Sequence, residues 1–113
     1  MLLPVIVLAG CGVEASTQDE ATCKDASNYF SATGHELVMV RRLEDPGTVG
    51  LYALIVDGMA PDDEELADAV ADLGGRLDLA REEPEYMNLL AVQSGVAILQ
   101  DRCDDFGLGW NYS

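Results

Sequence analysis

The sequence predicts an all-α domain, a small antiparallel four-helix bundle closed by one disulfide, and three observations lead to it. Apolar residues recur at steps of three and four over most of the chain, which is the period of a helix with one buried face. Prolines and acidic residues precede several of these segments, as they do at helix N-termini. Cys23 and Cys103 lie on the apolar stripes of the first and last segments, whose ends share a pole in an up-down-up-down bundle.

The first helical segment begins near Asp19. Thr17, with Glu20 three residues later, is one candidate N-cap, and Asp19 is the other. Gly34 weakens this helix or ends it, because glycine costs about 1 kcal/mol relative to alanine in a helix interior. The apolar stripe comprises Cys23, Ala26, Phe30, Thr33, Leu37 and Val40.

Residues 35–58 admit two interpretations. The short apolar runs at 36–40 and 49–56, separated by an Asp-Pro-Gly turn sequence, suit a β-hairpin and would make the fold α+β. Alternatively, Asp45 is an N-cap and Pro46 is the first helical residue. We favour the helix, whose stripe contains Val49, Tyr52, Val56 and Met59, with Leu51 and Ile55 alongside.

The third segment starts at Pro61, and the four acidic residues that follow suit the positive end of a helix dipole. Asp68, Asp72 and Arg76 fall on its outer side. The pair Gly74-Gly75 predicts a weak point or an early stop. The inner stripe comprises Leu66, Val70, Leu73, Leu77 and Ala80.

The last segment begins at Glu82 to Glu83, with Pro84 just inside the helix. Phe106 and Trp110 follow it in a glycine-rich tail, which packs back onto the bundle or extends from it. The stripe of this segment has the most regular spacing in the chain, and it comprises Leu89, Val92, Val96, Leu99 and Cys103.

The N-terminus has the pattern of a sorting signal. An apolar run at 2–8 leads into Leu-Ala-Gly-Cys at 8–11, and small residues at the end of such a run are what a signal peptidase cleaves. This tetrapeptide resembles the bacterial lipobox, which implies that Cys11 is lipidated and becomes the first residue of the mature protein. Because no Lys or Arg precedes the run, we expect a basic region upstream of Met1. The predicted organisation is a signal peptide at 1–10, a flexible tether at 11–20, a helical domain at 21–106 and a tail at 107–113.

The remainder of the chain carries a second resemblance. Cys23 stands early in the first helix, Met-Ala-Pro-Asp-Asp-Glu-Glu-Leu at 59–66 starts a later one, and Cys103 closes an Ala/Val-rich helix. This pattern resembles short helical lipoproteins of high-GC Gram-positive bacteria. The resemblance implies an all-α fold and carries over no catalytic residue.

One of the three cysteines is assigned to lipid, and the other two are candidates for a disulfide. With Cys11 lipidated, Cys23 and Cys103 are left as one pair in an exported chain, where disulfides persist. In the bundle both side chains point inward, with Cα atoms about 6 Å apart. A pair of free buried thiols is the alternative. Since no Cys-x-x-Cys spacing occurs, a thioredoxin-like motif is excluded and a cysteine-rich zinc site is not expected.

The charge of the chain argues against two classes of partner. Six Lys and Arg face 21 Asp and Glu, which gives a formal net charge of -15. Such a surface repels phosphate backbones and anionic lipid headgroups, so we expect no nucleic-acid partner and no charge-driven docking on membranes. No run of about 18 apolar residues follows residue 11, so we expect no transmembrane helix there.

Few residues suggest chemistry, and we predict no metal site and no cofactor. His35 is the only histidine, and no nucleophile or ligand pattern lies near it in the sequence. The acidic run 57–65 fails as a calcium loop because Met59 and Pro61 fall at ligand positions. The last helix ends in an acidic cluster, either a solvated helix end or a contact for a cation, formed by Asp101, Asp104 and Asp105.

Trp110 and Tyr112 in the tail are candidate stacking surfaces for a sugar or a peptide, or a cover for one end of the core. Because no catalytic motif occurs, we expect no enzyme. The sequence predicts a membrane-anchored extracytoplasmic lipoprotein that presents a small acidic helical domain in a binding or envelope role. The alternatives are a secreted helical effector or inhibitor without lipid, loose calcium binding by the acidic surface, and a small envelope hydrolase with Asp57, Asp101 or Asp104 beside His35.

Overall fold

The computed structural model describes residues 16–30 and 43–108, and the described chain is helical with no strand. In order, the helices are α1 (Thr17–Phe30), α3 (Pro46–Asp57), α4 (Glu64–Glu82) and α5 (Tyr86–Asp105). The predicted all-α class is therefore confirmed. The alternative hairpin is wrong, because its second strand lies inside α3, while its first strand falls outside the described residues.

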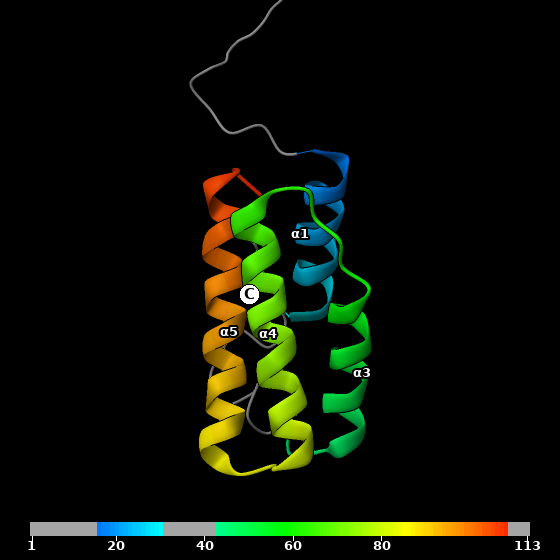
Figure 1. Ribbon diagram of the computed structural model, residues 1–113, viewed down its shortest axis with the longest axis vertical. Helices are drawn as coiled ribbons and strands as arrows, with labels where there is room; N and C mark the ends of the chain where they lie inside the picture. Colours follow the sequence, from blue (N-terminus) through cyan, green and yellow to red (C-terminus); the bar gives the residue numbers. More distant parts are fainter. Residues whose placement is uncertain (1–15, 31–42, 109–113) are drawn as a thin grey trace, which may run out of the picture.

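The two long helices form the frame of the molecule. α4 and α5 have 19 and 20 residues and run antiparallel, whereas α1 and α3 have 14 and 12 and lie one beyond the other along the same side (Figure 1). α1 and α4 begin, and α5 ends, at what we call the upper pole. α3 begins, and α4 turns into α5, at the lower pole (Figure 1). Successive described helices alternate in direction, which confirms the bundle.

α1 begins earlier than predicted. The Ser16 hydroxyl accepts a hydrogen bond from the Asp19 N–H (3.0 Å), and the Asp19 carboxylate accepts one from the Ser16 N–H (3.2 Å). This reciprocal pair is a capping box with Asp in place of Glu, and it starts the helix at Thr17. The predicted tether at 11–20 is therefore wrong over its last four residues, and the predicted caps at Thr17 and Asp19 give way to Ser16.

α3 begins as predicted. Asp45 is the N-cap, and its carboxylate accepts hydrogen bonds from the Gly47 N–H (3.1 Å) and the Thr48 hydroxyl (3.3 Å), with Pro46 following at the first helical position. The predicted stripe residues Val49, Tyr52 and Val56 are buried, and Met59 packs against the core. The two residues that were predicted to lie beside this stripe differ in burial: Ile55 is half-buried, whereas Leu51 is exposed.

The predicted starts of the two long helices are wrong by a few residues. α4 begins at Glu64, because the Asp63 carboxylate caps it by accepting from the Leu66 N–H (2.9 Å), so Pro61 lies in the preceding loop. α4 also continues through Gly74-Gly75 as far as Glu82, which leaves Pro84 in the turn before α5. The packing of both helices on the core overrides the two glycines.

The predicted stripes of these helices are confirmed, since every member is buried: Leu66, Val70, Leu73, Leu77 and Ala80 in α4, and Leu89, Val92, Val96, Leu99 and Cys103 in α5. Phe30 at the end of α1 meets Tyr52 of α3 edge to face, with ring centroids 5.0 Å apart. One core therefore extends through the four described helices.

The C-terminal end of α5 turns back onto this core. The Leu108 N–H donates to the Cys103 carbonyl (2.9 Å), and the Gly107 N–H donates to the Asp104 carbonyl (2.9 Å). These are the two hydrogen bonds of a Schellman motif, with Gly107 in the left-handed region (φ 76°). Phe106 and Leu108 pack against the core, as expected for a tail that folds back.

Candidate functional site

The two cysteines of the helical domain form a disulfide, which confirms the predicted pairing and rules out the alternative of two free thiols. Cys23 of α1 and Cys103 of α5 have Cα atoms 5.8 Å apart and are 80 residues apart in the sequence. Both are buried, with 2% and 0% of their surfaces exposed. The bond ties α1 to α5 near the upper pole, so its position makes it a structural bond.

A second tie at this pole is a buried carboxylate that the sequence patterns do not reveal. Asp19 is 3% exposed, and its Oδ1 accepts hydrogen bonds from the N–H groups of Asp62 (2.8 Å) and Asp63 (3.0 Å). Burial raises the pKa of this carboxyl, but hydrogen bonds from the backbone of Asp63, Ser16 and Asp62 and from the Ser16 side chain outweigh burial and hold the pKa below 3.8. Asp19 therefore stays ionised and links α1 to the loop before α4.

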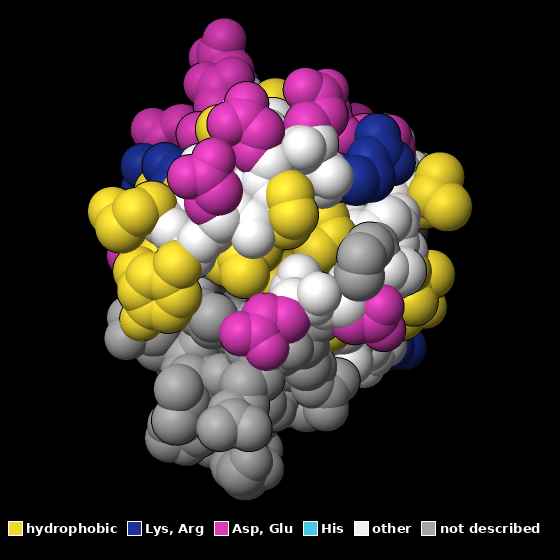
Figure 2. Space-filling model, turned by 90° about the horizontal axis from the view of Figure 1, so that it is seen from below, with side chains coloured by type: hydrophobic (Ala, Val, Ile, Leu, Met, Phe, Trp, Pro, Cys, Tyr) yellow, Lys and Arg dark blue, Asp and Glu magenta, His cyan; other side chains and the backbone are white. Residues whose placement is uncertain are grey.

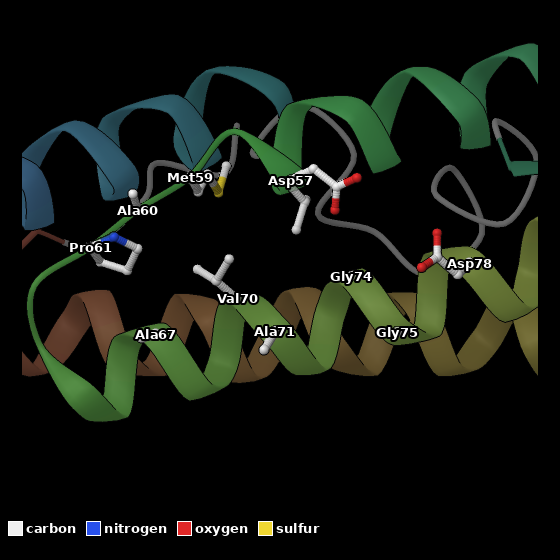
Figure 3. A pocket seen from close by; sticks show the side chains of 11 residues that line it. Asp57, Met59, Ala60, Pro61, Ala67, Val70, Ala71, Gly74, Gly75 and Asp78 are labelled. Atoms are coloured by element: carbon white, nitrogen blue, oxygen red, sulfur yellow. The ribbon is translucent and has the colours of Figure 1, made fainter.

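An open groove of about 510 Å³ lies between α3, the loop that follows it, and α4. Figure 3 shows its floor of small residues along α4, including Ala67, Ala71 and Gly74-Gly75. A side chain at Gly74 would lie 3.6 Å from Val56, whereas the space over Gly75 is open. The residues expected to weaken α4 therefore shape this groove.

Two carboxylates lie at the edge of the groove. Asp57 is at the end of α3 and Asp78 is on α4, and both side chains are exposed (Figure 3). Asp78 also faces Arg81 at 3.6 Å. The described lining contains no histidine, cysteine or serine, and it offers apolar contact and negative charge.

The upper pole carries two smaller hollows. One, of about 350 Å³, lies beside the disulfide and is lined by Glu20, Cys23, Lys24, Ser27, Asn28, Gly107 and Leu108. The other, of about 200 Å³, lies between the start of α4 and the end of α5 and is lined by Asp63, Glu65, Arg102, Asp105 and Phe106. In the second hollow Arg102 lies 3.7 Å from Asp105 and offsets part of the acidic charge.

The other predicted site residues are either exposed or outside the described ranges. Asp101 and Asp104 are exposed at the end of α5, on a different helix from Asp57. Across residues 16–30 and 43–108, no three His, Cys, Asp or Glu side chains are grouped so that they could hold a metal ion. The lipidation site, the lone histidine and the two tail aromatics lie outside the described residues, namely Cys11, His35, Trp110 and Tyr112.

Comparison with protein-family models, curated proteins and solved structures gives no match. The resemblance to short helical lipoproteins therefore stays a prediction, as does the lipidation of Cys11. Of the helices described above, none has both the length and the apolar content needed to cross a bilayer.

Proposed function

We propose that the chain is a lipoprotein held on the outer face of a cell membrane through Cys11, where it presents a small acidic helical domain in a non-enzymatic binding or envelope role. The observation that carries this proposal is Leu-Ala-Gly-Cys at 8–11, placed at the end of an apolar run. A cysteine in this position is the residue that lipoprotein processing modifies.

The disulfide supports export. Disulfides persist in oxidising compartments outside the cytosol and are rare inside it. Because Cys23 and Cys103 are joined to each other, Cys11 is the remaining cysteine of the sequence. An exported chain with one cysteine directly after an apolar segment fits lipid attachment.

The negative charge of the domain is consistent with membrane attachment through lipid, without an electrostatic contribution from the protein surface. With a net charge of -15, the chain gains no attraction from anionic headgroups. One acyl chain gives only marginal membrane binding, so stable attachment requires more than one chain on the modified cysteine. The domain would then stand off the bilayer, repelled by it and facing outward.

A binding or envelope role fits the described surface better than hydrolysis does. The candidate acids Asp57, Asp101 and Asp104 are exposed and come from two helices, and the described lining of the groove contains no histidine, cysteine or serine. A hydrolase would need an acid, a base and a nucleophile converging within hydrogen-bond reach.

Metabolic labelling tests the anchor. In bacterial cells fed a labelled fatty acid, we expect the chain to carry label and to fractionate with membranes. Cys11→Ala should lose both properties, because the acceptor thiol is gone. Cys23→Ser is the matched control: it also removes a cysteine, and it breaks the disulfide, yet it should keep the label.

Two results would contradict the proposal. Label that persists in Cys11→Ala would place the lipid elsewhere. An unlabelled chain recovered from the medium, cleaved before residue 11 or 12, would instead support a secreted effector or inhibitor. Intact mass separates the two, since acyl chains add roughly hundreds of daltons.

A further inference from the structure

α3 carries no charged residue before its last one, Asp57. Residues 46–56 contain no charged residue, although the chain has 21 acidic residues. A helix of this kind is normally buried all round, but α3 lies at the edge of the molecule (Figure 1), and Leu51 and Leu54 are 53% and 70% exposed. Viewed from the lower pole, apolar side chains protrude on the side where α3 lies and also on the opposite side (Figure 2). This face is therefore suited to contact with another apolar surface.

Three exposed residues of α3 and its exposed C-cap Gly58 form a regular stripe. Gly47, Leu51, Leu54 and Gly58 are all exposed and follow one another at steps of four, three and four. By helical geometry this stripe lies opposite the face that carries the buried Val49 and Val56. Steps of three and four are those of the a and d positions of a coiled coil. We call these four residues the Gly-Leu stripe.

The Gly-Leu stripe has the same order of glycine and leucine in both directions. If two copies of α3 pair antiparallel about a two-fold axis, Leu51 of each copy lies opposite Leu54 of the other, and Gly47 lies opposite Gly58. The leucines then pack at the centre, and the glycines at both ends let the two backbones approach closely. An isologous interface requires such a self-complementary surface.

We propose that the Gly-Leu stripe is a homodimerisation surface, through which α3 packs antiparallel on α3 of a second copy. The self-complementary order of the stripe favours a second copy over a different partner. Two chains of charge -15 repel each other where their surfaces are charged, so charge restricts their pairing to an uncharged region such as residues 46–56. Antiparallel pairing also keeps the two Asp57 carboxylates at opposite ends of the interface.

The pairing is weak in solution. A standard interface uses about 20–30 residues from each side, and a single helix of 12 residues provides far fewer. Copies anchored in one membrane share a plane, which raises their effective concentration. This last step depends on the proposed function, but the pairing itself does not, so its test uses the full chain with Cys11→Ala to remove any lipid.

Sedimentation velocity over a concentration series up to about 1 mM measures the pairing in the range expected for a weak complex. We expect the Cys11→Ala chain to shift toward dimer, and the added change Leu54→Glu to weaken the dimer at least tenfold. Leu79→Glu is the matched control, because Leu79 is an exposed leucine (45%) on α4, and it should change nothing. Absence of dimer, equal weakening by Leu79→Glu, or no effect of Leu54→Glu would overturn the proposal.

Mixing variants tests the direction of the pairing and does not depend on one substitution folding well. Leu51→Lys and Leu54→Glu chains, each weakened alone, should dimerise when mixed, because the new charges lie opposite each other. A mixture of Leu51→Lys and Leu51→Glu should recover less. If the mixture of Leu51→Lys and Leu51→Glu recovered more dimer than the mixture of Leu51→Lys and Leu54→Glu, the antiparallel arrangement would be overturned. Binding of the Cys11→Ala chain to phosphatidylcholine vesicles through Leu54, without self-association, would overturn the dimer in favour of a lipid surface.

Discussion

A single carboxylate, that of Asp19, performs two jobs at the upper pole. It completes the capping box that starts α1, and it accepts the N–H groups of Asp62 and Asp63 from a loop more than 40 residues away. The first job can be inferred from the local sequence, since Ser and an acidic residue stand three positions apart. The second depends on where α3 ends, which no local pattern specifies. Asp19 was therefore predicted only as a possible cap, and its hydrogen bonds to the distant loop were not predicted.

We expect Asp19→Asn to lower the free energy of unfolding by about 1–3 kcal/mol at neutral pH. The amide oxygen can still accept from the Asp62 and Asp63 N–H groups, but the amide nitrogen then faces the Ser16 N–H, donor against donor. Urea unfolding measures the loss, with Glu20→Gln as an exposed control on the same turn.

The effect of Asp19→Asn on stability should also depend on pH. Because the pKa of Asp19 in the folded chain lies below 3.8, its ordinary value, the ionised carboxylate contributes stability fully above that pH and loses the contribution as the pH falls through the folded-state pKa. The difference between wild type and Asp19→Asn should therefore be largest near neutrality and shrink below pH 3.8. A difference that grows in acid would contradict this role.

At the scale of helices, glycines differ in what surrounds them. Gly75 on α4 faces open space in the groove. Gly95 on α5 is buried, and a Cβ there would lie 2.9 Å from Cδ of Arg76 and 3.1 Å from Cδ1 of Leu73. Arg76 crosses over Gly95 to donate to the Ala91 carbonyl (2.8 Å) and also pairs with Asp72 (2.8 Å). One glycine is therefore tolerated, and the other is required for the close contact of α4 with α5.

Substitution by alanine should change the stability of the protein in opposite directions at these two glycines. Gly75→Ala should raise stability by about 1 kcal/mol, because alanine favours the helix and its methyl group meets nothing. Gly95→Ala should lower stability by about 1–2 kcal/mol, because overpacking displaces Arg76 and outweighs the gain in helix propensity. Thermal unfolding of both variants measures the difference, and a gain in both would mean that Arg76 moves aside freely.

The helices themselves were predicted better than their ends. The stripes ending in Ala80 and in Cys103 follow from periodicity, because burial of one face imposes a repeat of three and four. The starts assigned to Pro61 and to Glu82 to Glu83, with Pro84 just inside, were wrong, because proline is favoured in the loop before a helix as well as in its first turn. The groove also could not be predicted, since it exists only where the end of α3 packs against the small residues of α4.

Over the whole molecule, the disulfide closes a loop that contains α3 and α4 entirely. Cys23→Ser should lower the free energy of unfolding by about 2–5 kcal/mol, because the unfolded chain is no longer constrained over a separation of 80 residues. That is a large share of the stability of a domain this small. Chemical unfolding with and without reductant measures it. Cys103→Ser should lose the same amount, whereas a Cys11→Ser chain should match the wild type.

The same bond determines how the domain bears mechanical force. A pull applied between the start of α1 and the end of α5 passes along residues 16–23, through the two sulfur atoms, and out along residues 103–108. Residues 24–102 lie off this covalent path, so α3, α4 and most of α5 carry no tension along the backbone. Stretching can peel away only the two short ends, and the bundle between them stays the same length under load.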